Sequence, residues 1–245
     1  MAGEDTVEIV ALIAAAGRGI RMGGEVEKQF MLLGKKPLLV HALEHFQELS
    51  EVNQVIVSAP EERVEYCERE IVGRFGLSKV VAIVPGGEVR QESIYRALGR
   101  VSPTADLVVT HDAARPFLFE DVLARTIATA RTCGAAVAAI PESDTVKEVN
   151  PDGAILRTVD RRLLWRAQTP QAFAWEVLQE AFSRARADGY VATDEAELVE
   201  RAGYEVRVVP GSRWNIKVTT PEDMELAKLL LAWVAKGSDR RPGLD

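Results

Sequence analysis

A loop of small residues with two nearby cations is the part of this sequence that most clearly carries chemistry. The segment Ala14-Ala15-Ala16-Gly17-Arg18-Gly19-Ile20-Arg21-Met22-Gly23-Gly24 follows an apolar run, and Lys28 comes shortly after it. Small residues let the backbone approach a ligand closely, and successive N–H groups at the end of a strand can cradle phosphate oxygens. Arg21 and Lys28 add fixed positive charge, which suits a triphosphate whose phosphorus is attacked. The segment therefore predicts a nucleotide-binding loop.

The loop matches neither of two standard nucleotide-binding motifs. The dinucleotide fingerprint Gly-x-Gly-x-x-Gly requires glycine where Met22 stands, and no Gly-Lys-Ser/Thr ending is present to form a Walker loop. At this point a flexible glycine turn with solvated Arg and Lys side chains remains the alternative.

A second polar segment, His111-Asp112-Ala113-Ala114-Arg115-Pro116, follows another apolar run. Ligands of open α/β sheets bind at the carboxyl ends of the strands, so Asp112 is a candidate partner for a metal and Arg115 for a phosphate. A structural Asp–Arg pair that caps the following helix is the alternative.

The elements that must position these residues alternate along the chain. Nearly continuous apolar runs, typical of strands buried on both faces, cover residues 7–14, 54–58, 80–84, 106–110 and 135–140. Helical patterns lie between them at residues 37–49, 61–75, 91–101 and 120–132. This alternation predicts an α/β fold with a mostly parallel sheet and helices on both faces.

The alternation breaks after Ile140. Two short runs of mixed polarity, 143–149 and 154–159, flank the turn signal Asn150-Pro151-Asp152-Gly153, which predicts an antiparallel excursion from the main sheet. We expect three later helices: one at 175–188, one at 194–202 with Thr193 as N-cap, and one from Pro221 to about Ala235 with Thr220 as cap. A short strand is expected at 205–209.

Composition limits the classes of protein and partner. The 245 residues contain no linker-like stretch, so we expect one domain over residues 1–236 and a frayed tail at 237–245. A net charge of −7 disfavours nucleic acid and anionic membrane surfaces as partners. No apolar run is long enough to span a bilayer, and we identify no signal peptide. Cys67 and Cys133 fit neither a metal nor a disulfide pattern, which favours a cytoplasmic location.

Between Val7 and about Ala232 the chain resembles the 2-C-methyl-D-erythritol 4-phosphate cytidylyltransferase family. The ordered motifs that carry the resemblance are Ala15-Ala16-Gly17-x-Gly19-x-Arg21-Met22 with Lys28-Gln29, Gly86-Gly87-x-x-Arg90-Gln91-x-Ser93, His111-Asp112-Ala113-Ala114-Arg115-Pro116, Asp144-Thr145-Val146-Lys147, Thr158-Val159-Asp160-Arg161, Thr169-Pro170-Gln171, Thr193-Asp194-Glu195 and Asn215-Ile216-Lys217-Val218-Thr219. Any one of them could be accidental, whereas their joint occurrence in order is specific.

The resemblance implies a Rossmann-like nucleotidyltransferase fold of the GT-A-like kind, a three-layer sandwich with an antiparallel β-arm at about residues 141–166. In the family this arm clasps a second subunit. The resemblance therefore implies a homodimer in which Thr145 or a neighbouring cation completes the partner's site.

The implied reaction is attack by a phosphate oxygen of 2-C-methyl-D-erythritol 4-phosphate on the α-phosphorus of CTP, which expels pyrophosphate in non-mevalonate isoprenoid biosynthesis. The nucleophile is already an anion at neutral pH, so no general base is required. By analogy with the family, Arg21 and Lys28 stabilise the transition state, and Arg161 and Lys217 orient the attacking phosphate. Mg²⁺ would be bound mainly through the CTP phosphates, with Asp112 as a nearby candidate group.

The resemblance also assigns two sets of binding residues. The nucleotide set is Ala14, Ala15, Ala16, Gly17, Gly19, Arg21, Lys28, Gly86, Glu88, Ser93, Asp112 and Lys217. The set for the acceptor phosphate is Asp112, Arg115, Thr145, Arg161, Thr169, Thr193 and Lys217.

Other functions remain as alternatives. The nearest is a cytidylyltransferase for ribitol 5-phosphate or another polyol phosphate; more distant are an NAD(P)-dependent oxidoreductase and a non-catalytic nucleotide-binding module. His41-Ala42-Leu43-Glu44-His45 matches the pattern of inverted zinc proteases, but no third ligand is evident and a helix-packing role is expected. His111 could orient its loop, be a buried hydrogen-bonded residue or act in catalysis.

Overall fold

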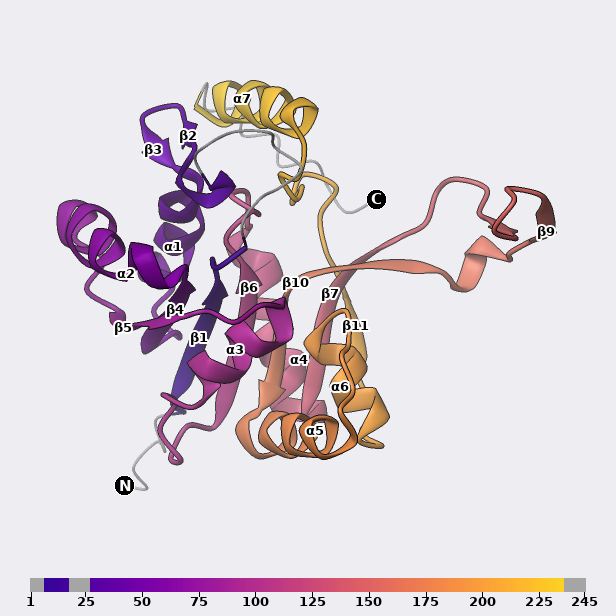
Figure 1. Ribbon diagram of the computed structural model, residues 1–245, viewed down its shortest axis with the longest axis horizontal. Coiled ribbons are helices and arrows are strands. Elements are labelled where there is room, and N and C mark those ends of the chain that lie inside the picture. Colours follow the sequence, from indigo (N-terminus) through magenta and orange to yellow (C-terminus); the bar gives the residue numbers. More distant parts are fainter. Residues whose placement is uncertain (1–6, 18–26, 236–245) are drawn as a thin grey trace.

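A mostly parallel sheet forms the centre of the protein in the computed structural model, which describes residues 7–17 and 27–235 (Figure 1). Within these residues its strand order is β11-β7-β10-β6-β1-β4-β5. The strands are β1 Ile9–Ala14, β4 Gln54–Ala59, β5 Val80–Pro85, β6 Leu107–Asp112, β7 Ala135–Pro141, β10 Trp165–Ala174 and β11 Arg207–Pro210. All paired neighbours are parallel except that β10 runs antiparallel to both β6 and β7.

Helices cover both faces of this sheet. Alternate residues of β1 separate the two sides: Ile9, Ala11 and Ile13 pack in one core cluster, and Val10 and Leu12 pack in another. The first cluster includes residues of α1 Leu38–Glu48 and α4 Glu120–Cys133. The second includes residues of α3 Arg90–Leu98, α5 Trp175–Asp188 and α6 Glu195–Arg201. The expected three-layer α/β architecture is confirmed.

A smaller cluster lies beyond the carboxyl ends of the central strands. The hairpin of β2 Leu32–Leu33 and β3 Lys36–Pro37 packs with α7 Pro221–Ala235 around Leu33, Met224 and Leu230. Helix α7 has the predicted bounds, and Thr220 Oγ1 accepts a hydrogen bond from Asp223 N–H at 3.3 Å. In the described parts of the chain, no helix is long and apolar enough to cross a membrane.

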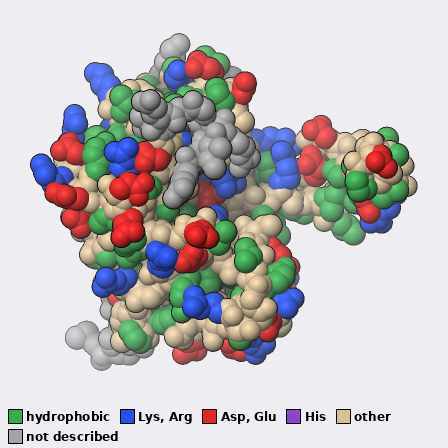
Figure 2. Space-filling model, viewed as in Figure 1, with side chains coloured by type: hydrophobic (Ala, Val, Ile, Leu, Met, Phe, Trp, Pro, Cys, Tyr) green, Lys and Arg blue, Asp and Glu red, His purple; other side chains and the backbone are tan. Residues whose placement is uncertain are grey.

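An antiparallel arm projects from the ends of β7 and β10, as the sequence predicts (Figure 1). Its distal hairpin pairs β8 Lys147–Val149 with β9 Ile155–Thr158. Figure 2 shows the arm standing away from the body, with hydrophobic side chains over its tip and Lys and Arg side chains where it joins the body. Val149, Ile155 and Leu156 are exposed there.

The region predicted as one helix at 61–75 is helical throughout, but the type of helix changes along it. A 3₁₀ turn at Glu61–Arg63 leads into α2 Val64–Tyr66 and then into a π-helical stretch at Cys67–Gly73. Cys67 and Ile71 are the buried residues of the π-helical stretch, so this segment still presents an apolar side to the sheet.

One strand was not predicted, and one helix cap was predicted at the wrong residue. Strand β10 was not predicted, because Gln168, Thr169 and Pro170 interrupt any apolar run and proline is rare within a sheet. The side chains of Gln168 and Thr169 are nevertheless buried, and the register of β10 against β7 shifts between Ala167 and Gln171. The N-cap of α6 is Asp194 rather than Thr193, since the Asp194 carboxylate accepts from Glu197 N–H at 3.0 Å.

Candidate active site

The two polar segments meet at one edge of the sheet. Ala14, the last residue of β1, is aligned with Asp112, the last residue of β6, and with Ser58 of β4 on its other side. From β1 the chain proceeds to β4 and β5 on one side and returns to β6 on the other. This reversal is a topological switch point, where open α/β sheets bind their ligands.

A cavity of about 840 Å³ opens at this edge. Ten of the residues predicted to bind substrates line it: Ala14, Ala15, Ala16, Gly17, Lys28, Gly86, Glu88, Ser93, Asp112 and Lys217. Gly19 and Arg21 lie outside the described residues. The cavity therefore brings together the nucleotide loop, the loop after β5, the end of β6 and the segment before α7.

The loop after β5 contacts the nucleotide loop directly. Gly86 N–H donates to Ala59 O at 2.8 Å, and a Cβ atom added to Gly86 would lie 2.0 Å from the Ala16 Cβ. Glycine is required here because the two backbones approach too closely for a side chain. Ser93 Oγ accepts from Gly87 N–H at 3.0 Å and donates to Val89 O at 3.2 Å. Its hydroxyl thus holds the loop in place.

An ion pair on α3 supports the same loop. Glu88 N–H donates to Glu92 Oε2 at 3.0 Å, and Arg96 pairs with Glu92 at 2.6 Å while donating to Gly86 O at 2.8 Å. Arg96 also lines the cavity. These two residues were not predicted to belong to the site, although the i, i+4 spacing of Glu92 and Arg96 is the signal by which such a pair is recognised.

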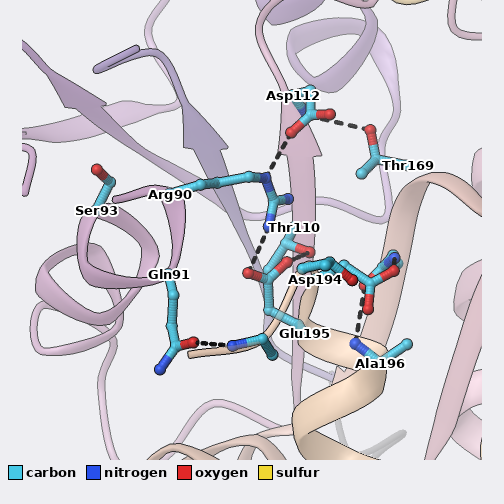
Figure 3. Close-up of polar contacts among 12 residues, drawn as sticks. Arg90, Gln91, Ser93, Thr110, Asp112, Thr169, Asp194, Glu195 and Ala196 are labelled. Carbon is cyan, nitrogen blue, oxygen red and sulfur yellow. Dashed lines mark hydrogen bonds and ion pairs between the residues drawn. The ribbon is translucent and has the colours of Figure 1, made fainter. Parts of the chain in front are cut away.

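Asp112 lies at the centre of a group of cations, of which Figure 3 shows Arg90. Its Oδ1 is 2.7 Å from Arg90 Nε, and its Oδ2 is 2.7 Å from Lys217 Nζ and 3.8 Å from Arg115 Nε. Burial raises the pKa of this carboxyl, but the charges of Arg90, Lys217 and Arg115 outweigh burial and hold the pKa well below its usual range. Asp112 is therefore a carboxylate that fixes the positions of cations in the cleft.

A hydrogen-bonded chain runs from Asp112 through Thr169 to His111. Thr169 Oγ1 accepts from Asp112 N–H at 3.1 Å and lies 3.0 Å from His111 Nδ1, while His111 Nε2 lies 3.1 Å from Arg115 O. Burial lowers the pKa of His111 to about 3, so its ring is neutral. A carbonyl oxygen can only accept, so we assign the ring proton to Nε2, and the Thr169 hydroxyl donates to Nδ1. His111 thus orients the loop after β6.

The segment that carries Lys217 is fixed to β6 and β10. Val218 N–H donates to Ala114 O at 2.8 Å, and Arg115 Nη1 donates to Asn215 O at 2.8 Å. The buried Asn215 side chain donates to Thr169 O at 2.7 Å. These contacts place the Lys217 ammonium against Asp112, with 39% of the lysine side chain left exposed to the cavity and solvent.

Five residues predicted to bind the acceptor phosphate do not line this cavity. Arg115 and Thr169 lie behind its wall, where they hold the elements described above. Thr193 is exposed just before α6, and its hydroxyl donates to Glu197 at 2.8 Å. Thr145 and Arg161 lie exposed on the arm, where the Arg161 guanidinium donates to Ser143 O.

Arg90 was missed as a site residue. It pairs with Asp112 and with Glu195, which comes from α6. Both Arg90 and Glu195 stand inside motifs that carry the family resemblance, so a signal was present. The periodicity of the sequence could not show that the two motifs meet.

The described residues contain no group of three or more His, Cys, Asp or Glu side chains arranged to hold a metal ion. The two histidines of the zinc-protease pattern are hydrogen-bonded to backbone carbonyls, His41 Nε2 to Leu33 O at 2.8 Å and His45 Nε2 to Pro116 O at 3.1 Å. They serve packing around α1.

Fold and site together define an α/β protein with a nucleotide-sized cleft at its switch point, to which Lys28 and Lys217 contribute positive charge, as in nucleotidyltransferases. The sequence model of the family described as IspD, 2-C-methyl-D-erythritol 4-phosphate cytidylyltransferase, matches residues 9–232. This chain belongs to that family, and the resemblance found in the sequence is confirmed.

Relatives and solved structures agree with this assignment. The 2-C-methyl-D-erythritol 4-phosphate cytidylyltransferase of Geobacter metallireducens is 45% identical over 226 residues, covering 91% of this chain and 97% of that protein. A bifunctional enzyme, IspD/IspF, of Desulforudis audaxviator is 46% identical over 91% of this chain, which spans only 57% of that relative's length. The crystal structure of the cytidylyltransferase from Thermus thermophilus has a TM-score of 0.76 at 34% identity, covering 92% of this chain and all of that one.

Proposed function

We propose that this protein is a cytidylyltransferase that forms 4-diphosphocytidyl-2-C-methyl-D-erythritol and pyrophosphate from CTP and 2-C-methyl-D-erythritol 4-phosphate, a step of isoprenoid biosynthesis. The observation that carries the proposal is that the family match, residues 9–232, includes every described residue that lines the cavity. The cavity also presents Lys28 and Lys217, as transfer between two phosphates requires.

In the proposed mechanism the protein supplies position and charge. The backbone of Ala14–Gly17 and the loop at Gly86 would hold the cytidine. Lys28, together with Arg21, would stabilise negative charge on the α-phosphate and the leaving pyrophosphate. Lys217, held by Asp112 at 2.7 Å, would orient the attacking phosphate, joined by Arg161. Because that phosphate is already an anion, no side chain has to remove a proton.

We also propose that the reaction uses Mg²⁺. The donor set fits an ion bound mainly by phosphate: Asp112 faces the cavity, and Mg²⁺ commonly binds through one or two carboxylates with substrate phosphates and water. When bound, the ion would neutralise charge on the triphosphate. Asp112 is the side chain that would hold it, in competition with the ammonium of Lys217.

The arm supports a proposed homodimer. Thr145 and Arg161 lie on the arm and do not line the cavity of their own chain. The arm also exposes apolar side chains, of which Leu163 is 84% exposed and Ile155 62% exposed. Docking against a second copy would bury these side chains and could deliver Thr145 and Arg161 to that copy's cleft. We further propose a cytoplasmic location, which is supported by the free thiols of Cys67 and Cys133.

The proposed activity is tested by pyrophosphate release from CTP and Mg²⁺ with a panel of acceptors. We expect kcat/KM to be highest with 2-C-methyl-D-erythritol 4-phosphate and much lower with ribitol 5-phosphate. A higher kcat/KM with ribitol 5-phosphate would show that the proposed acceptor is wrong, but the protein would still be assigned as a cytidylyltransferase. Absence of pyrophosphate release with every acceptor would overturn the enzyme assignment.

Replacing the nucleotide-loop cations should remove activity without unfolding the protein. We expect Lys28→Ala and Arg21→Ala each to lower turnover by ~10²–10³-fold, since each removes one preorganised charge from the transition state. Steady-state kinetics with circular dichroism would check both parts. Near-normal turnover in both variants would contradict the mechanism.

A further inference from the structure

Arg90 bridges two carboxylates that come from different elements, Asp112 from β6 and Glu195 from α6 (Figure 3). From the start of α3, its Nε donates to Asp112 Oδ1 at 2.7 Å and its Nη1 donates to Glu195 Oε1 at 2.6 Å. Glu195 is 1% exposed, and its other oxygen accepts from the Thr110 hydroxyl at 2.9 Å. The guanidinium is therefore fixed between the carboxyl end of β6 and the first residue of α6.

Gln91, the residue after Arg90, is hydrogen-bonded to the segment that leads into α6. Gln91 Nε2 donates to Tyr190 O at 3.0 Å, and its Oε1 accepts from Ala192 N–H at 2.7 Å. The start of α3 thus holds the segment 190–195 at three points. This segment contains Thr193, which the family resemblance assigns to the acceptor phosphate. On its other side, α3 follows the Gly86 loop of the nucleotide cavity.

We propose that Arg90 is a positioning residue for the transfer reaction: it holds Asp112 so that the second carboxylate oxygen retains Lys217, and it couples this arrangement to segment 190–195. This proposal rests on the proposed function. The fork of arginine is needed because two different nitrogen atoms contact two separate carboxylates. A lysine keeps the charge but presents a single nitrogen, so it cannot reproduce both contacts in the same geometry.

If Arg90 only stabilised the fold, kcat and melting temperature would fall and recover together in a set of variants. Arg90→Gln leaves Glu195 buried without its cation, which should lower the melting temperature as well as kcat. The double variant Arg90→Gln/Glu195→Gln removes that unpaired charge, so we expect its melting temperature to recover in part, since Asp112 keeps Lys217 and Arg115 as partners. The kcat of the double variant should remain low, because Asp112 still lacks Arg90. Arg90→Lys should also lower kcat.

The experiment measures kcat, KM for each substrate and melting temperature for these variants and for Arg125→Gln. Arg125 pairs with Asp121 at 2.8 Å on α4 and does not line the cavity, so this control loses an Arg–carboxylate pair outside the site. We expect kcat to fall by ~10–100-fold in Arg90→Gln and in the double variant, because this range is typical of groups that orient a site residue. In Arg125→Gln we expect kcat to stay near the wild-type value. Recovery of kcat together with melting temperature in the double variant, or wild-type kcat in Arg90→Lys, would overturn the proposal.

The rate of pyrophosphate release by the wild-type protein distinguishes failure of this proposal from failure of the proposed function. If wild type releases no pyrophosphate with any acceptor, the proposed function fails, and titration calorimetry with CTP then tests Arg90 on the same proteins. We expect CTP to bind at least ~10-fold more weakly to Arg90→Gln and to the double variant, since Asp112 lines the cavity. Unchanged CTP affinity in both variants would overturn the role of Arg90.

Discussion

Lys217 and Asp112 form an ion pair in which each partner has a different task. The Asp112 side chain is 9% exposed and belongs to the cleft wall, whereas the Lys217 side chain is 39% exposed. We expect Lys217→Gln to lower kcat by ~10²-fold and to change the melting temperature little, because the lost charge acts mainly on substrate. Lys228→Gln is the matched control, since Lys228 pairs with Glu225 at 2.6 Å on the exposed side of α7. An equal loss of activity in both variants would argue against a specific role for Lys217.

The buried ring of His111 links folding stability to pH. Burial lowers its pKa from 6.5 to about 3 in the folded protein, so between these values the unfolded chain takes up a proton that the folded chain does not. This contribution to stability is fully present above pH 6.5 and is lost as pH falls toward 3. At pH 5 the loss amounts to about 2 kcal/mol.

The variant His111→Gln should lack this pH dependence while retaining a side-chain N–H donor. Urea unfolding at pH 7.5 and at pH 5 would measure the change for both proteins. We expect wild type to lose more stability between these two pH values than the variant does. Equal losses would show that His111 is protonated in the folded state.

At the scale of elements, the close approach of the Gly86 loop to the Ala14–Gly17 loop is a condition for binding nucleotide. We expect Gly86→Ala to weaken CTP binding by at least ~10-fold, because the new Cβ would lie 2.0 Å from the Ala16 Cβ and must displace one backbone. Gly99→Ala, at the other end of α3, meets its nearest atom at 3.5 Å and should bind CTP normally. Calorimetric titration of both variants checks this expectation, and equal affinities would contradict it.

Strands buried on both faces were predictable because each is a nearly continuous apolar run. Strand β10 was not, since the side chains of Gln168 and Thr169 find hydrogen-bond partners, among them Ser212 and His111, that lie far away in sequence. The same limit applies to the site. Small residues and cations marked the nucleotide loop, whereas the role of Arg90 depends on Asp112 and Glu195, which lie 22 and 105 residues away along the chain.

At the scale of the whole molecule, net charge gave a poor guide to the site. The chain carries a formal charge of −7, yet Arg90, Arg115 and Lys217 surround the single carboxylate of Asp112, and Lys28 lines the same cavity. Folding brings these cations together around one carboxylate, although Glu61, Glu62 and Glu88 also line the cavity, so the charge summed over the chain does not describe this local arrangement. Net charge therefore bears on extended polyanions and not on a bound triphosphate.

The proposed exchange of arms between two copies can be tested with two inactive variants. Lys28→Ala impairs the cleft and Arg161→Ala impairs the arm, so each should be nearly inactive alone. In a hybrid dimer, the Arg161→Ala subunit has an intact cleft and would receive an intact arm from its Lys28→Ala partner. With free subunit exchange, half the dimers are hybrids with one working site of two, so a 1:1 mixture should recover about a quarter of wild-type activity.

If each arm serves its own cleft, both sites of the hybrid stay defective and mixing restores nothing. A mixture of Lys28→Ala with Lys217→Gln provides the control, because both changes lie in the cleft and no hybrid contains an intact one. Activity recovered only in the first mixture would show that Arg161 acts across the dimer. A light-scattering mass of one chain at the assay concentration would contradict the dimer itself, and Arg161 would then have to act within its own subunit.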